Sequence, residues 1–192
     1  MNDGLPYIAI PTRLCSAEEK GIVQWRPAAE PNMSTRRQIW MPRNLADSIN
    51  EKSWPPVGRE DDRAADRRRR DCVALMTAFI RGDDMEVGTG DDRVDFKAMT
   101  PPSGQDWSAW ELRPTPQRPT TRIFGVMASC QDFLAWACVP KQGLTPAAQT
   151  DLARRAVTQS TVVLGQAIIK SRSKPCAATL GGSEYGWWDA DD

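Results

Sequence analysis

From about residue 61, the hydrophobic and polar positions of the chain recur with the period of an α-helix. From there to residue 80, apolar side chains recur three or four positions apart behind a run of charged residues. This spacing places the apolar side chains on one side of an α-helix. They are Cys72, Leu75, Met76, Phe79 and Ile80. The pattern therefore predicts one amphipathic helix over Asp61–Ile80.

Four short segments after this helix are rich in apolar and β-forming residues. Each is bounded by Pro, Gly, Ser or Asp, which are residues that favour turns. The segments are Arg93–Met99, Trp107–Arg113, Thr121–Ala128 and Asp132–Val139. Consecutive strands that are joined by short turns pair as antiparallel neighbours. We therefore predict an α+β fold, in which an antiparallel four-strand meander packs against helices.

A second helix follows the four strand segments. Thr145 is a suitable N-cap, and Pro146 suits the first helical position because it needs no amide donor there. Apolar residues then continue on one side of the segment, which predicts a helix to about Lys170. Along the last predicted strand, simple alternation places Phe133, Ala135, Ala137 and Val139 on one face, and Leu134, Trp136 and Cys138 on the other.

Residues 1–60 have a different composition, because prolines and tryptophans interrupt every long periodic pattern. Short strands are expected at Tyr7–Ile10 and Ile22–Trp25, and a short helix at Leu45–Lys52 with Asn44 as its N-cap. Tryptophan side chains are costly to leave in water. We therefore expect an N-terminal extension (1–60) packed on a core domain (61–170), followed by a C-terminal tail (171–192).

Composition excludes several classes of function. The chain has no histidine, so it lacks the commonest general base and the commonest zinc ligand. Neither a Walker-type nor a G-x-G-x-x-G nucleotide motif is present. The five cysteines show no C-x-x-C spacing and are interpreted mostly as small buried hydrophobes. We expect no cofactor and no metal, and a soluble cytoplasmic protein without a membrane partner, since no segment of the sequence suits a bilayer.

Charge is balanced overall but unevenly distributed. Lys+Arg and Asp+Glu both number 25, yet the segment Trp110–Lys174 is rich in cations. The run Arg67–Arg70 could contact RNA or acidic groups, or it could be a solvated helix face paired with neighbouring aspartates. The acidic loop Gly82–Asp92 lacks the ligand spacing of a calcium-binding loop.

One ordered set of motifs resembles a known family. The sequence contains WELRP, then TTRIFGVMASCQDFLAWACVPK, then a Thr-Pro helix start. In this order and spacing, the segment of about residues 61–159 resembles the RelE/HigB superfamily of bacterial toxins, and its phage-associated branch in particular. The resemblance implies a small toxin that cleaves messenger RNA without a metal, commonly on the ribosome, and that a cognate antitoxin silences.

The resemblance also implies site residues. Arg122 matches the family's phosphate-binding arginine, Arg113 matches a basic position on the preceding strand, and Lys141 lies at the family's basic corner. These three are the candidate catalytic residues. Arginine suits the chemistry because its planar guanidinium binds phosphate in a bidentate manner and stays charged. We expect Arg113 and Arg122 to project toward one concave basic surface bordered by Lys141.

Two other interpretations stay open at this stage. Arg113 could pair with a surface carboxylate, Arg122 could anchor the sheet by bonding backbone carbonyls, and Lys141 could be an exposed turn lysine. The family often places a His or Tyr near the end of the fold, but both tyrosines of this chain lie outside the matched segment. Glu111 adds a charge that would repel phosphate.

The alternative function is a non-catalytic, phage-type inhibitor or protein-binding module on the same scaffold.

Overall fold

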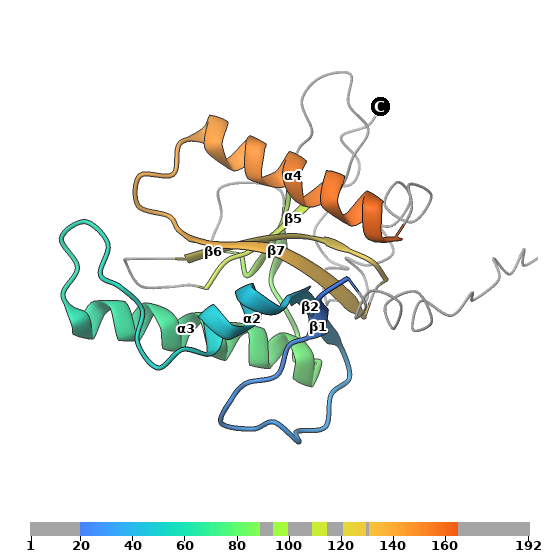
Figure 1. Cartoon of the computed structure of the whole chain (residues 1–192), viewed down its shortest axis with the longest axis horizontal. Coiled ribbons are helices and arrows are strands. Elements are labelled where there is room, and N and C mark those ends of the chain that lie inside the picture. Colours follow the sequence, from blue (N-terminus) through green and yellow to red (C-terminus); the bar gives the residue numbers. More distant parts are fainter. Residues whose placement is uncertain (1–19, 89–93, 100–108, 115–120, 130, 165–192) are drawn as a thin grey trace, which may run out of the picture.

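One mixed β-sheet with helices on both faces forms the centre of the protein (Figure 1). The computed structural model describes residues 20–88, 94–99, 109–114, 121–129 and 131–164. The strands are β1 (Ile22–Gln24), β2 (Gln38–Pro42), β3 (Val87–Gly88), β4 (Phe96–Met99), β5 (Ala109–Leu112), β6 (Thr121–Met127) and β7 (Asp132–Pro140). The helices are α2 (Arg43–Asn50), α3 (Asp62–Arg81) and α4 (Pro146–Leu164). In Figure 1, α4 covers one face of the sheet, and α2 and α3 cover the other.

The sheet is larger than the sequence pattern predicts. Its strand order is β1-β2-β7-β6-β5-β4-β3, and neighbours from β4 to β7 pair antiparallel. The predicted fold, an antiparallel four-strand meander, is nevertheless wrong. β2 pairs parallel with β7, and the two-residue β3 pairs parallel with β4. The α+β class stands, but the sheet is mixed.

The missed strand β2 lies in the proline-rich segment that discouraged a strand prediction. It is only five residues long, and Pro42 ends it. A proline at a strand end removes no hydrogen bond from the interior of the ladder. The partner of β2 is β7, more than ninety positions later in the chain, as in the pair Ile39↔Phe133. A local pattern does not reveal a pairing at this separation.

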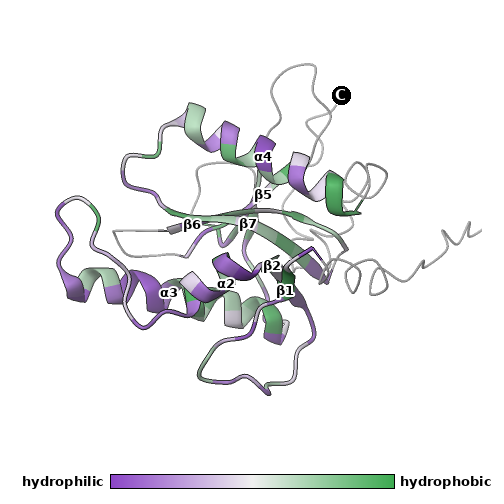
Figure 2. Ribbon diagram, in the orientation of Figure 1, coloured by the Kyte–Doolittle hydropathy of each residue, from purple (hydrophilic) through white to green (hydrophobic). Residues whose placement is uncertain are grey.

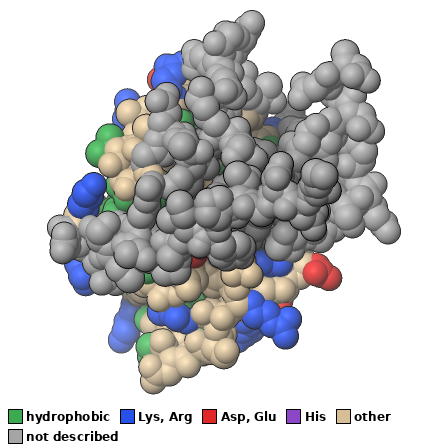
Figure 3. Space-filling model, turned by 90° about the vertical axis from the view of Figure 1, so that its right-hand side faces the viewer, with side chains coloured by type: hydrophobic (Ala, Val, Ile, Leu, Met, Phe, Trp, Pro, Cys, Tyr) green, Lys and Arg blue, Asp and Glu red, His purple; other side chains and the backbone are tan. Residues whose placement is uncertain are grey.

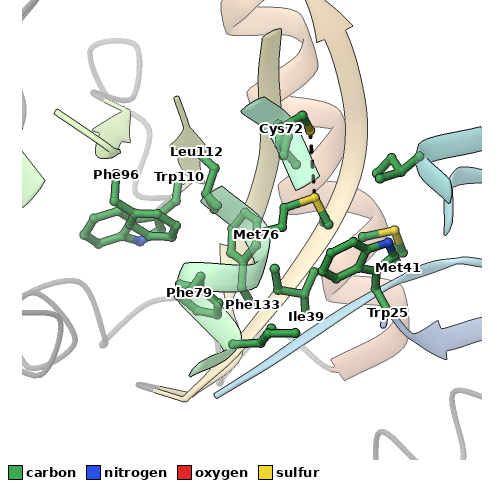
Figure 4. Packing of buried hydrophobic residues seen from close by; sticks show 14 of the residues in the cluster. Trp25, Ile39, Met41, Cys72, Met76, Phe79, Phe96, Trp110, Leu112 and Phe133 are labelled. Carbon is green, nitrogen blue, oxygen red and sulfur yellow. Dashed lines mark hydrogen bonds between the residues drawn. The ribbon is translucent and has the colours of Figure 1, made fainter. Parts of the chain in front are cut away.

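Helix α3 confirms the predicted amphipathic helix. The Asp61 side chain accepts a hydrogen bond from the Ala64 amide at 2.8 Å, and Gly82 ends the helix in the left-handed conformation (φ 85°). Its apolar side packs on the sheet, as Figure 4 shows. Phe79 stacks on Phe96 with ring centroids 5.8 Å apart. Replacing one such buried aromatic by alanine typically costs about 3–5 kcal/mol.

Helix α4 packs on the opposite face. Thr145 Oγ1 accepts a hydrogen bond from the Ala148 amide at 3.2 Å, as its predicted N-cap role requires. The buried side of the helix carries small residues, and Ala153 lies against Ala109 and Phe124 of the sheet. Small side chains allow a helix to approach a sheet closely. Figure 2 shows that the helices on both faces of the sheet carry hydrophilic as well as hydrophobic residues.

The described part of the N-terminal segment contributes to the main sheet. β1 confirms the strand expected near Ile22–Trp25, whereas Tyr7–Ile10 lies outside the described residues. Helix α2 begins at Arg43, directly after Pro42, so Asn44 is not its N-cap. Trp25 and Trp40 are buried. Residues 22–50 therefore contribute strands and core side chains to the same sheet as β4–β7.

A β-bulge changes the faces of β7. Phe124 pairs with Ala137, but the next residue, Gly125, pairs with Ala135, so Trp136 is extra. The predicted alternation therefore holds only up to the bulge. Phe133, Ala135 and Cys138 lie toward α3, whereas Leu134, Trp136, Ala137 and Val139 lie toward α4. One extra residue in a strand shifts every following side chain to the other face.

Candidate functional site

The candidate arginines meet at the end of the sheet where β5 stops and β6 begins. Glu111 and Arg113 are two positions apart, so their side chains share one face of the strand. The neighbouring register pairs Glu111 with Phe124, two positions from Arg122 on that same face. This is the face covered by α4. Strand alternation and register thus bring three charged side chains from two strands to one place.

Both arginines contact the Glu111 carboxylate. Arg122 Nε lies 2.5 Å from Glu111 Oε1, and Arg113 Nε lies 3.2 Å from Glu111 Oε2. Arg122 Nη1 also donates a hydrogen bond to the Thr121 carbonyl at 3.1 Å. The Glu111 oxygens accept no well-aligned hydrogen bond within the described residues. The pairing is therefore chiefly Coulombic.

Burial is the decisive property of this cluster. The exposed fraction is 0% for Glu111, 5% for Arg122 and 7% for Arg113. Burial lowers the pKa of the Arg122 guanidinium below its ordinary value, Glu111 raises it, and Arg113 lowers it further. A buried charge has lost its hydration and is stabilised mainly by its partner. Removing one partner from such a pair is therefore strongly destabilising. The expected open basic surface is not observed at these two arginines.

Lys141 lies at the same end of the sheet but outside the buried cluster. It follows β7 directly, in a turn where the Leu144 amide donates to the Lys141 carbonyl at 3.0 Å. Its side chain is exposed. The structure thus brings Arg113 and Arg122 together on Glu111, whereas Lys141 lies outside this buried contact. Their assignment to catalysis stays a prediction.

Glu111 binds the two arginines and does not act only as a charge that opposes phosphate. Residues two apart on a strand share a face. A Glu-x-Arg spacing on a buried strand is therefore itself a signal for an internal ion pair. Lys97 lies directly across from Glu111 on β4, which adds a further cation beside this carboxylate.

The arginine run of α3 divides into two environments. Arg68 is buried, donates to Glu60 at 3.0 Å and to the Pro55 carbonyl at 2.9 Å, and lies over the Trp54 ring. Arg69 and Arg70 both pair with Asp66 nearer the surface. The interpretation as a helix face paired with neighbouring aspartates is confirmed for Arg69 and Arg70. It is wrong for Arg68, which is buried and pairs with Glu60. On the face shown in Figure 3, the visible Lys and Arg side chains are spread out and do not form one patch.

Other site classes receive no support within the described part of the chain. It contains no group of three or more His, Cys, Asp or Glu side chains placed to hold a metal ion. None of its helices has the length and apolar character needed to cross a membrane. No family model matches the sequence, and no significant match was found among the curated proteins or the solved structures.

Proposed function

We propose that this protein acts by binding a protein partner, without cleaving RNA. The observation that carries the proposal is the buried contact of Arg113 and Arg122 with Glu111. Guanidinium groups that bind phosphate must be accessible to it, but the whole side chains of Arg113 and Arg122 are only 8% and 6% exposed and face a carboxylate. The partner would be an antitoxin or another protein.

The lack of histidine supports the same proposal. RNA cleavage by the 2′-hydroxyl needs stabilisation of the phosphate charge and the movement of two protons. The chain has no histidine. The arginines that the resemblance assigns to the phosphate instead hold β5 and β6 together through Glu111. If these arginines have a structural role, the function would reside in a binding surface elsewhere on the protein.

The experiment compares the wild-type protein with a variant that lacks all three buried charges, Glu111→Leu/Arg113→Leu/Arg122→Met. Each protein is induced in a bacterial host, and growth, transcript integrity and stoichiometric co-purification of a defined partner are measured. Purified protein is also incubated with RNA in EDTA. We expect intact transcripts for both proteins, and the same partner and Kd for both. Cleavage of RNA by the wild type, abolished in a folded variant, would contradict the proposal.

A second candidate is the metal-independent endoribonuclease that the resemblance implies. One observation favours it: the two guanidiniums converge on one anionic group, and a phosphodiester carries the same charge as a carboxylate. Under this candidate, Glu111 would leave the arginines when RNA binds. Arg122→Lys distinguishes the two functions, since it keeps the charge but loses the planar fork. The nuclease would lose most of its activity, whereas the binding protein would keep its Kd.

A further inference from the structure

We propose that Cys72 and Cys138 are a redox pair that forms a reversible disulfide between α3 and β7. Their sulfur atoms lie 4.0 Å apart, although the residues are 66 positions apart in the chain. Both are free thiols. A disulfide needs a sulfur separation of about 2 Å, so side-chain rotation and a small shift would complete the bond. This proposal does not depend on the proposed function.

The β7 bulge creates this juxtaposition. If the strand alternated regularly through Trp136, with no bulge, Cys138 would lie on the side of α4, away from α3. With it, Cys138 packs against the core cluster that contains Cys72. The thiol of Cys72 also donates to the Met76 sulfur at 3.9 Å, the contact drawn as a dashed line in Figure 4. Three sulfur atoms are thus neighbours between the helix and the sheet.

The two thiols have different access to solvent, which assigns their roles. Cys138 is half-buried, whereas Cys72 is fully buried. The contact with Cys138 and burial raise the pKa of the Cys72 thiol well above its ordinary value. Thiolates are the reactive species in this chemistry, so Cys138 would meet a small oxidant first and Cys72 would react second.

The reaction with diamide, a small azo oxidant, illustrates the electron balance. The Cys138 thiolate adds to one nitrogen of the N=N bond, which forms an S–N bond. The Cys72 sulfur then attacks the Cys138 sulfur, so the S–S bond forms and the S–N electron pair returns to nitrogen. The two thiols lose two electrons and two protons, and the azo compound gains both as the hydrazine. Dithiothreitol reverses the result by thiol–disulfide exchange.

The test uses full-length protein in which Cys15, Cys130 and Cys176 are replaced by Ser, so that only the proposed pair can react. The folded protein is treated with diamide, its remaining thiols are alkylated, and a tryptic digest is analysed by mass spectrometry. We expect Asp71–Arg81 linked to Ile123–Lys141, two hydrogens lighter than the separate peptides, and separated again by dithiothreitol. The closed loop should raise the Tm by several degrees, on the order of 5–10 °C.

The matched control adds Cys138→Ser, which must abolish both the linked peptide and the Tm increase. Two results would overturn the proposal. One is complete alkylation of both thiols after diamide treatment of the folded protein, with no linked peptide. The other is a linked peptide that forms only when the protein is first unfolded in urea, because the folded geometry would then have no part in the reaction.

Discussion

Glu111 changes the functional interpretation of the two arginines that contact it. From the motif alone, Arg113 and Arg122 are candidate phosphate ligands. In the structure, both lie on the buried Glu111 carboxylate, at 3.2 and 2.5 Å. Buried ion pairs are sensitive to the loss of one member, because the remaining charge stays in a medium that solvates it poorly. The cluster therefore makes a sharp prediction about stability.

Glu111→Gln is expected to lower the free energy of unfolding by about 3–5 kcal/mol, since it leaves two buried guanidiniums without their carboxylate. The variant without any of the three charges should lose less than this single change. Urea denaturation followed by tryptophan fluorescence measures both. The control is Glu30→Gln, which breaks an ion pair with Arg81 whose side chains are 49–50% exposed. This surface pair should contribute only about 0–1 kcal/mol. Equal losses for the two Glu→Gln variants would contradict the prediction.

At the scale of elements, the paired strands β6 and β7 determine which side chains meet. The bulge at Trp136 sends Cys138 toward α3, and Val139 toward α4. Gly125 lies where the register shifts. A Cβ at this position would meet the Leu134 carbonyl oxygen and the Phe133 ring more closely than real Cβ atoms approach their neighbours. The close packing of β6 and β7 at the bulge therefore leaves no room for a side chain at position 125.

Gly125→Ala is expected to destabilise the protein by at least about 1–3 kcal/mol, because the clash is partly with the backbone of the neighbouring strand and cannot be relieved by a side-chain rotation. Gly143→Ala is the comparison. Gly143 has open space around its Cβ position but a φ of 78°, so alanine there should cost only about 1–2 kcal/mol of left-handed strain. Thermal unfolding ranks the two variants. A larger loss at Gly143 would show that the bulge adapts easily.

The elements also show what local sequence patterns can and cannot predict. Features that depend on neighbours in the chain could be predicted. They are the helical spacing of apolar residues in α3, the N-cap at Thr145 and four of the strand segments. β2 and the bulge could not, since β2 depends on its pairing with β7, and the bulge depends on the register between β7 and β6. At the candidate site, alternation predicts that Glu111 and Arg113 share a face. Their burial depends on the packing of distant segments and was not predicted.

At the scale of the whole molecule, β7 is an internal strand because β2 covers one of its edges. β1 and β2 come from the first fifty residues, and the order β1-β2-β7-β6 joins them directly to the sheet of the later chain. Trp25, Ile39 and Met41 contribute to the main core cluster together with Phe133. The segment is thus part of the cooperative structure, although its composition differs from that of the rest.

Removal of residues 1–56 is therefore expected to prevent stable folding. The deletion would uncover the backbone edge of β7 and the apolar side chains that pack against Trp25 and Ile39. An unpaired apolar edge strand is a template for association with other chains, so the truncated protein should aggregate or lose cooperative unfolding. Size-exclusion chromatography and thermal denaturation monitored by circular dichroism measure these outcomes. Removal of residues 1–19 is the control, because it shortens the chain at the same end but leaves β1, β2 and α2 in place. A monomeric 57–192 fragment with a cooperative transition and the Tm of the control would show that the sheet from β7 to β3 is stable without its first two strands.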